Sequence, residues 1–440
     1  MSLDKTVHQK PVQAGRIDQR RGEAESLPVR DEVLAARDDQ DDSGRACLLS
    51  QALTRENLLV AWKRVKANKG SAGVDGLSMS DTIEHLQTHW PHIRSDLLSG
   101  EYRPAPVRRV QIPKPGGGQR ELGIPTVTDR LIQQALLQVL QPILDPTFSD
   151  HSYGFRPGRR AHDAVLSAQR YVQEGFRVVV DVDLETFFDR VNHDVLMHRL
   201  SRRIEDKAVL RLVRRYLQAG VMHNGVARRR DAGTPQGGPL SPLLANVLLD
   251  EVDRELERRG HRFVRYADDC NVYVRSHKAG ERVLGGLRKI YSQLDLKVNE
   301  KKTTVSSAFN HKLLGFSLWL SPEGQVKRVV AVASISTFKR RIRQLTQRNC
   351  GRSLSQVAKE LRRFLLGWKA YFRLAQSSWR FRKLDEWLRH RLRALQLKHW
   401  KRGPTTFREL RRMDVPCDVA RRIASHAGRW WHSSRYSLNL

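Results

Sequence analysis

The chain has 440 residues, and its 79 lysines and arginines exceed its 47 acidic residues to give a formal net charge of +32. This excess favours a polyanionic partner, with nucleic acid ahead of a membrane surface. No apolar run reaches the roughly 18 residues of a membrane span, and the N-terminus lacks the apolar stretch of a signal peptide. Four widely spaced cysteines without a CxxC pair argue against a disulfide framework or a cysteine-rich zinc site. The cysteine pattern fits a reducing cytoplasm. The length predicts roughly two to four domains.

The N-terminal third begins with a polar leader at residues 1–45, which is poor in aromatic residues and ends in an acidic cluster. This composition is typical of a flexible segment. Apolar spacing predicts a helix over residues 54–65, and a second helix is expected over residues 77–100. Between them, the glycine-broken segment 69–76 predicts a loop.

A hairpin is expected next, because the extended runs 107–113 and 121–125 flank the glycine-rich turn 114–120. Lys114 and Arg120 stand at the two ends of this turn and could close on a phosphate. A glycine-rich turn alone is weak evidence, so a plain structural hairpin remains open.

The middle of the chain predicts a helix over residues 129–144, then an apolar strand over 177–183 that carries Asp181 and Asp183. A proline- and glycine-rich loop at 233–242 feeds a further helix that is expected over 243–256. Such a loop turns backbone N–H groups and a positive helix end toward a ligand, although it is also an ordinary way to begin a helix.

The most informative segment is a second predicted hairpin, in which two alternating apolar runs flank Tyr266-Ala267-Asp268-Asp269. Adjacent carboxylates repel each other, and a divalent cation removes that cost because hard cations prefer oxygen ligands. With an aspartate from the end of strand 177–183, this tip could hold two Mg²⁺ for phosphoryl transfer. The alternative is that Asp268 and Asp269 only form a turn.

Residues 338–412 are strongly basic, with 23 lysines and arginines against four acidic residues, a net +19. Their apolar residues have helical spacing, which predicts amphipathic helices with basic outer faces. A basic face can be mere solvated surface, but so high a concentration favours a phosphate-binding surface. Arg389, Arg391 and Arg393 are our candidates for RNA contacts there.

Taken in order, these segments resemble the bacterial group II intron reverse transcriptases, also called maturases. The resemblance runs from about residue 48 to about residue 431 and rests on the order and spacing of its motifs. The matching motifs are KGSAGVDG, IPKPGGGQRELGIPTVTDRLIQQAL, YGFRPGRRAHDAV, VDVDLETFFDRVNHDVL, GTPQGGPLSPLLANVLLDEVDREL, RYADD, LDLKVNEKKT, HKLLGF and LLGWKAYFRLAQSSWRFRKLDEWL.

The resemblance implies an α+β right-hand polymerase with fingers, palm and thumb. We expect fingers and palm over residues 46–335 and a helical, basic thumb or maturase domain that binds RNA over 336–440. Many family members continue into an HNH-type endonuclease with cysteine pairs, which this sequence lacks. The resemblance is therefore to the class without that endonuclease, and it implies priming from an existing nick or a replication-fork strand.

By the same resemblance, Asp183, Asp268 and Asp269 are the catalytic, metal-binding triad for two Mg²⁺ ions. Asp181 competes for the first position because it lies two residues away on the same face of the strand. The family pattern of Asp, five residues, Asp is met by Asp183 and Asp189, which favours Asp183.

The remaining site residues are also carried over from the family. Phe188 matches the bulky residue that excludes a 2′-hydroxyl, although its spacing alone favours a core phenylalanine. The other candidates are Lys114 and Arg120 on the incoming triphosphate, Gln236 in the nucleotide pocket, Lys302 near the primer end, and Arg156 and Arg159 on template or intron RNA, for which structural pairing is an equal alternative.

The resemblance implies RNA-directed DNA polymerase activity, which is a nucleotidyl transfer. It also implies binding of a group II intron RNA, a mobile element, to assist its splicing and its retrohoming by target-primed reverse transcription. The expected partners are that intron RNA, an RNA template with a DNA primer, dNTPs and target DNA, with no membrane. The expected location is the bacterial cytoplasm, at the nucleoid when the protein acts on DNA. One alternative is a related polymerase without an intron that serves phage defence or repair, and another is a splicing factor with an inactive palm, against which the intact aspartates argue.

Overall fold

The computed structural model describes residues 47–113, 119–223, 226–228, 232–234, 237–349 and 351–434. The predicted leader at residues 1–45 lies outside them. The described chain divides into two compact units, one of residues up to 164 with 178–305, the other of residues 165–177 with 306 onward. This division does not test the predicted boundary between residues 335 and 336, which stays a prediction. Across the described residues, no helix combines the length and the apolar character needed to cross a bilayer.

The first unit is built mainly from helices around two four-stranded sheets. Its helical segments are α1 (Leu48–Ala52), α2 (Arg55–Ala67), α3 (Met79–Ser99), α4 (Val127–Leu144), the 3₁₀ turn η2 (Asp145–Thr147), α6 (Phe187–Arg190), α7 (His193–Ser201), α8 (Lys207–Gln218), α9 (Ser241–Arg258) and α10 (His277–Gln293), while α5 (Ala161–Gln173) crosses the division. Its strands are β1 (Val107–Pro113), β2 (Gln119–Ile124), β3 (Val178–Val182), β4 (Val221–His223), β5 (Val226–Arg228), β6 (Arg262–Tyr266), β7 (Asp269–Val274) and β8 (Thr304–Ser307), which also crosses it.

Both predicted hairpins are confirmed. β1 pairs antiparallel with β2, and the sheet continues in the order β2-β1-β4-β5. The second sheet has the order β6-β7-β3-β8, with β6 and β7 forming the hairpin predicted around Asp268 and Asp269. β3 is interior to this sheet, which explains its continuous valine run, since an interior strand is buried on both faces.

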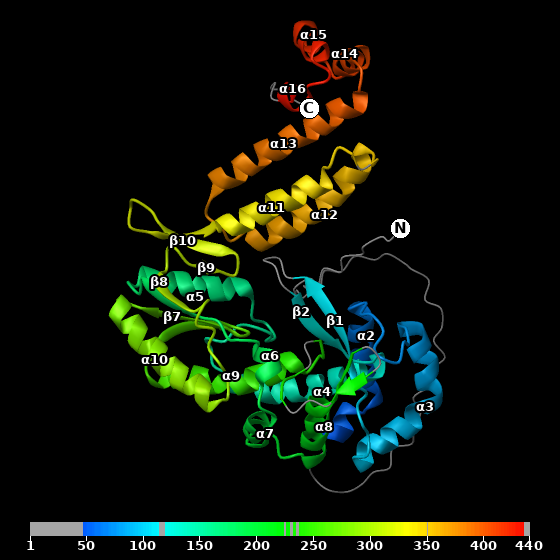
Figure 1. Ribbon diagram of the computed structural model, residues 1–440, viewed down its shortest axis with the longest axis vertical. Coiled ribbons are helices and arrows are strands. Elements are labelled where there is room, and N and C mark those ends of the chain that lie inside the picture. The colour runs from blue at the N-terminus through cyan, green and yellow to red at the C-terminus, as the bar shows by residue number, and fades with distance from the viewer. Residues whose placement is uncertain are drawn as a thin grey trace. The chain divides into compact units, whose positions relative to one another are not determined.

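The core of the first unit is dominated by α4 and α9. The apolar face predicted for residues 129–144 is buried at Leu131, Ile132, Ala135, Leu136 and Leu140, and each such leucine contributes about 1.5–3 kcal/mol. α9 contacts β6, and α10 contacts β3 and β7, so both helices support the hairpin sheet (Figure 1). The predicted helix 243–256 is therefore confirmed and begins two residues earlier, at Ser241.

The second unit has a three-stranded sheet and a set of basic helices. Its elements are β9 (Lys312–Leu313), β10 (Phe316–Leu320), β11 (Val326–Val330), α11 (Val332–Leu345), α12 (Leu354–Phe372), α13 (Ser378–Trp400), α14 (Gly403–Arg412), α15 (Cys417–Ser425) and α16 (Trp430–Ser433). Helices α11 to α13 share an apolar core, where the Phe338 and Trp368 rings lie 4.5 Å apart. The amphipathic helices predicted over 338–412 are thereby confirmed.

A buried carboxylate fixes the start of α4. Asp129 is 1% exposed and accepts hydrogen bonds from Tyr102 Oη at 2.8 Å, from Thr126 Oγ1 at 2.8 Å and from the backbone N–H of Ala105 at 3.2 Å. Burial raises the pKa of Asp129 despite these donors. The cluster ties the segment before β1 to the helix that carries much of the core.

We expect Tyr102→Phe to lower the free energy of unfolding by about 1–3 kcal/mol, because it removes a donor from a carboxyl group that water cannot reach. The control is Thr147→Val, which removes an exposed hydroxyl that donates to the Leu144 carbonyl in the same unit. This control should lose less than about 1 kcal/mol. Urea unfolding measures both, and equal losses would contradict the role given to the Asp129 cluster.

Candidate active site

The three predicted catalytic aspartates lie at one end of the hairpin sheet. β3 pairs antiparallel with β7, with Val182 opposite Cys270. Continuing this register by one residue sets Asp183, directly after β3, opposite Asp269 at the start of β7. Side chains of directly opposed residues have Cβ atoms about 4.5–5.5 Å apart. The backbone pairing thus brings together carboxylates that are 86 positions apart in the sequence.

Asp268 completes this group from the hairpin tip. Tyr266 pairs with Asp269, so only Ala267 and Asp268 form the turn. Ala267 has φ +59°, the left-handed conformation that two-residue hairpin turns favour. For a residue with a Cβ this conformation costs about 1–2 kcal/mol, so the surrounding structure must hold it.

The carboxylates affect one another electrostatically. Burial raises the pKa of Asp269 to about 6, with further contributions from Asp268, Asp181 and Asp183. Burial and the neighbouring Asp183 likewise raise the pKa of Asp181 to about 6. These shifts mean that keeping the carboxylates ionised in the folded chain costs desolvation and, to a smaller extent, repulsion, and a bound cation would offset both.

Lys302 partly neutralises this charge. Its Nζ atom lies 3.1 Å from Oδ2 of Asp183, and Lys302 lowers the pKa of Asp269. The segment before Lys302 is held against the end of β3, because the Asn299 backbone N–H donates to the Asp183 carbonyl at 2.8 Å. The Asp183 N–H in turn donates to Thr303 Oγ1 at 3.2 Å.

The spacing of the possible metal ligands and their chemistry point in different directions. Within the ranges that the structure describes, no three Asp, Glu, His or Cys side chains converge closely enough to hold a metal ion. The available donors are carboxylate oxygens, which are the ligands that Mg²⁺ prefers. The residues therefore fit a magnesium ion chemically, provided that Asp183 exchanges its partner Lys302 for the metal.

Phe188 lies on the short helix α6, which begins four residues after Asp183 in the chain. Its ring is partly buried, packs on the core and meets Phe187 edge-on at 5.0 Å. The Phe188 carbonyl accepts from the Thr234 N–H at 2.6 Å. A Cβ on Gly233 would lie 2.9 Å from the carbonyl oxygens of Phe188 and Asp189, so only glycine allows this approach. The proline- and glycine-rich loop is thereby held against Phe188.

Three predicted nucleotide contacts cannot be placed. Lys114 and Gln236 lie outside the described residues. The Arg120 backbone is part of β2, opposite Ile112 of β1, but its side chain is likewise outside the description. These residues remain candidates from the sequence alone.

Arg156 has a structural position. Its side chain is 3% exposed, and its guanidinium donates to Asp145 Oδ1 at 2.9 Å and to the carbonyls of Ser149 and Ser152 at 2.5 and 3.1 Å. Such a group is not accessible to RNA, so the geometry corrects our RNA-binding assignment in favour of the structural pairing. Arg159 is more exposed and pairs with Asp150 at 2.5 Å.

The three arginines chosen on α13 also differ from one another. Arg389 is 69% exposed and pairs with Asp385 on its own helix. Arg391 donates to Thr346 Oγ1 at 2.7 Å and lies over the Trp387 ring, and burial lowers its pKa. Arg393 is half-buried. Of the three, Arg389 is therefore the one most available to a phosphate.

An exposed aromatic site on the same helix was not predicted from the sequence. Trp379 is 52% exposed, and the Arg380 guanidinium and the Lys383 ammonium each lie 5.3 Å from its ring centre. An aromatic ring between cations suits base stacking combined with phosphate contacts. The signal was present as a tryptophan followed by basic residues one and four positions later.

Comparisons with protein families identify two domains in the chain. Residues 112–318 match the reverse transcriptase (RNA-dependent DNA polymerase) family, and residues 335–413 match the group II intron maturase-specific domain. The first range contains β3 and the β6–β7 hairpin, where the carboxylates lie. The second contains α12 and α13.

Individual relatives agree with both matches. The chain is 37% identical over 226 residues to protein YkfC of Escherichia coli, covering 50% of this chain and 59% of the relative. It is 28% identical over 388 residues to the group II intron-encoded protein LtrA of Lactococcus lactis, covering 73% of this chain and 63% of LtrA. A 91 kDa protein in a cob intron of Schizosaccharomyces pombe is 35% identical over 212 residues, which cover 47% of this chain and 25% of that protein.

The chain thus spans about three fifths of the length of YkfC and of LtrA. Its matches to the reverse transcriptase family and to the maturase-specific domain follow one another along the chain, and the fold mixes helices and strands, with the hairpin described above inside the first match. In both matched regions the chain is therefore similar to group II intron-encoded reverse transcriptases such as LtrA.

Proposed function

We propose that this chain is an RNA-directed DNA polymerase that extends a DNA primer along an RNA template and also binds a group II intron RNA to assist its splicing and mobility. The observation that carries the proposal is the group of opposed carboxylates at the end of β3 and the β6–β7 tip, within a reverse transcriptase domain. The maturase-specific domain supports the second part. The reaction would take place in the bacterial cytoplasm, at the nucleoid when DNA is the target.

In this proposal Asp183, Asp268 and Asp269 hold two Mg²⁺ ions. Bound there, the ions would activate the primer 3′-oxygen and neutralise charge on the pyrophosphate leaving group. The chain prepares the site by burying Asp269 beside the other carboxylates, and burial followed by their repulsion raises the pKa of Asp269 to about 6. Asp181 sits behind Asp183 on the strand and adds to that crowding.

Lys302 has two roles in the proposal. It neutralises Asp183 from 3.1 Å. Its side chain is 65% exposed, so it can swing away when a cation takes its place. The released ammonium would then be free to contact a primer phosphate, which agrees with its expected position near the primer end.

Phe188 would select deoxyribonucleotides. Its ring is packed against Phe187 and its backbone is fixed by Thr234, so it cannot easily yield to a 2′-hydroxyl. Exclusion would result from a steric clash rather than from an added attraction. Lys114, Arg120 and Gln236 would bind the rest of the incoming nucleotide.

The RNA-binding surface would lie on α13. Its outer face exposes Arg382, Lys383 and Arg389, while Leu384 and Leu388 face the core. Trp379 with its two cationic neighbours adds a stacking position. Because phosphate contacts carry no base information, this surface would hold intron RNA while RNA structure supplies specificity.

We expect Asp183→Asn to abolish primer extension on an RNA template, because it removes an anionic ligand with little change of shape. Asp181→Asn is the matched control and should retain extension, since Asp181 only adds repulsion. Extension with Mg²⁺ and dNTPs measures both variants. Near-normal activity of Asp183→Asn together with inactivity of Asp181→Asn would reverse the assignment of the first ligand.

We expect Arg389→Glu to weaken RNA binding and to flatten its salt dependence by roughly one phosphate, a slope change of about 0.7–0.9. The matched control is Arg258→Glu in the first unit, since Arg258 is 70% exposed and also pairs with an acidic residue of its own helix. Filter binding to intron RNA at several salt concentrations gives both slopes. Identical slopes for the two variants would move the RNA contact away from α13.

A further inference from the structure

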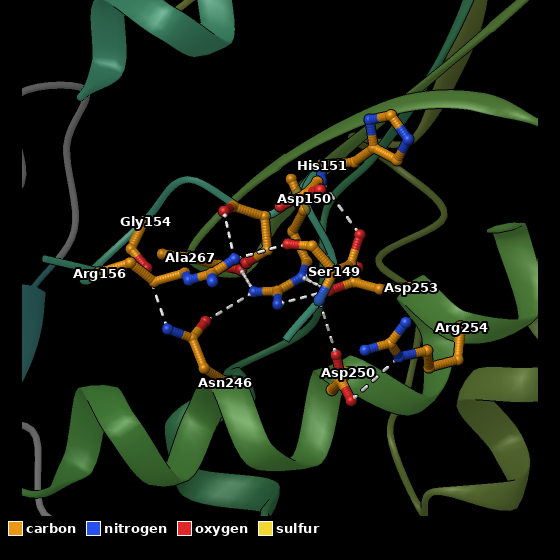
Figure 2. Close-up of polar contacts among 12 residues, drawn as sticks. Ser149, Asp150, His151, Gly154, Arg156, Asn246, Asp250, Asp253, Arg254 and Ala267 are labelled. Carbon is orange, nitrogen blue, oxygen red and sulfur yellow. Dashed lines mark hydrogen bonds and ion pairs between the residues drawn. The ribbon is translucent and has the colours of Figure 1, made fainter. Parts of the chain in front are cut away.

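One face of α9 carries a line of buried polar side chains directly beneath the hairpin. Asn246, Asp250 and Asp253 follow at intervals of four and three residues and are at most 1% exposed. Such spacing places them on one side of the helix. Figure 2 shows these three side chains directed from α9 toward Ser149, Gly154 and Ala267.

Arg265 of β6 connects this line to the hairpin tip. Its side chain is fully buried, and its Nε and Nη2 atoms donate to the Asp253 carboxylate at 2.6–2.9 Å. The Nη1 atom donates to Asn246 Oδ1 at 2.9 Å and to the Ala267 carbonyl at 2.9 Å. One guanidinium therefore joins helix α9 to the residue immediately before Asp268.

The same turn is held from its other side by Gly154. Asn246 Nδ2 donates to the Gly154 carbonyl at 2.9 Å. A Cβ on Gly154 would lie only 2.2 Å from the Ala267 nitrogen, so this backbone contact requires glycine. Ala267, with its left-handed φ of +59°, is thus fixed between Gly154 and the Arg265 guanidinium.

Stability alone does not account for this arrangement. Burying an ion pair costs desolvation energy, and apolar residues of similar volume often fold as well or better. The cluster does, however, satisfy the carbonyl of a strained turn and holds that turn at a defined position. The two residues that follow Ala267 are Asp268 and Asp269.

We propose that Arg265 and Asn246 are positioning residues that hold the hairpin tip in the conformation in which Asp268 and Asp269 can bind a divalent cation. The proposal rests on the proposed polymerase function for its kinetic consequence, but cation binding can be measured separately. Neither residue touches the reacting atoms, so each acts through Ala267. Asp253 serves as the anionic anchor of the Arg265 guanidinium.

The test uses the full chain with Asn246→Ala, which removes the hydrogen bonds from Asn246 to Gly154 and Arg265 but leaves the Arg265–Asp253 pair, which still joins β6 to α9. The control is Asp250→Asn, because Asp250 is equally buried on α9 but pairs with Arg203 at 2.5 Å and not with the hairpin. A second variant, Arg265→Lys, keeps a cation beside Asp253 but lacks the fork that also reaches Ala267.

Two readouts are needed. The first is the rise in melting temperature on titration with Mg²⁺ alone, which reports cation binding without catalysis. The second is single-nucleotide extension on an RNA template, analysed for the Mg²⁺ concentration at half-maximal rate, for kcat and for the dNTP KM.

We expect Asn246→Ala and Arg265→Lys to require about tenfold more Mg²⁺ in both readouts and to lose kcat, since a misplacement of about 1 Å can cost about a hundredfold. The dNTP KM should stay near the wild-type value, and Asp250→Asn should lose stability without a change in Mg²⁺ response. The proposal is overturned if the hairpin variants respond to Mg²⁺ as Asp250→Asn does. If the wild type binds Mg²⁺ but extends no primer, and the hairpin variants still lose Mg²⁺ binding, the positioning role survives and the polymerase function fails.

Discussion

The structure depends on keeping like charges close together. Asp181, Asp183, Asp268 and Asp269 lie at one end of a small sheet, and burial with mutual repulsion raises the pKa of Asp181 and Asp269 to about 6. Left alone, this repulsion would favour opening of the hairpin. The antiparallel register of β3 and β7 opposes that opening, because it is fixed by a ladder of backbone hydrogen bonds within a buried sheet.

Two cationic side chains act near the carboxylates in different ways: Lys302 pairs with one of them, and Arg265 holds the backbone of the hairpin tip. Lys302 is exposed and pairs directly with Asp183, so its contact is exchangeable. Arg265 is fully buried and is held by Asp253 and Asn246, so its contact with the hairpin is permanent. The exposed Lys302 contact suits a side chain that a ligand can displace, while the buried Arg265 contacts suit a fixed structural support. Both are needed if a site is to exchange its ligands and yet remain preorganised.

Local patterns in the sequence were sufficient to predict much of the fold. Alternating apolar residues around Asp268 and Asp269 and the continuous valines of β3 have strand periodicities, and the face of α4 has a helical one. These signals depend only on neighbours in the chain. The carboxylates of the strand end and of the hairpin tip were expected to act together, but the pairing of β3 with β7 that brings them together has no local signature and was not predicted.

The contacts that escaped prediction join residues without a local signature. Arg156 carries the positive charge expected of a nucleic-acid contact. Its guanidinium is nevertheless surrounded by the carbonyls of Ser149 and Ser152 and the carboxylate of Asp145. Neither the Arg265–Asp253 pair nor the contact of Gly154 with Ala267 follows from spacing, since both arise from how α9 meets the hairpin. Positive charge in the sequence therefore does not distinguish an arginine that binds RNA from one that pairs within the fold. The burial of the side chain does.

The most direct test of the account is to locate bound metal in a crystal of the full chain with an RNA–DNA primer-template, a non-hydrolysable dNTP and Mn²⁺ in place of Mg²⁺. Anomalous scattering identifies the ions without reference to activity. The account predicts two manganese ions bound by Asp183, Asp268 and Asp269, with Lys302 Nζ displaced from Asp183. Manganese held by Asp181 alone, or its absence from the hairpin tip while Lys302 still pairs with Asp183, would contradict it.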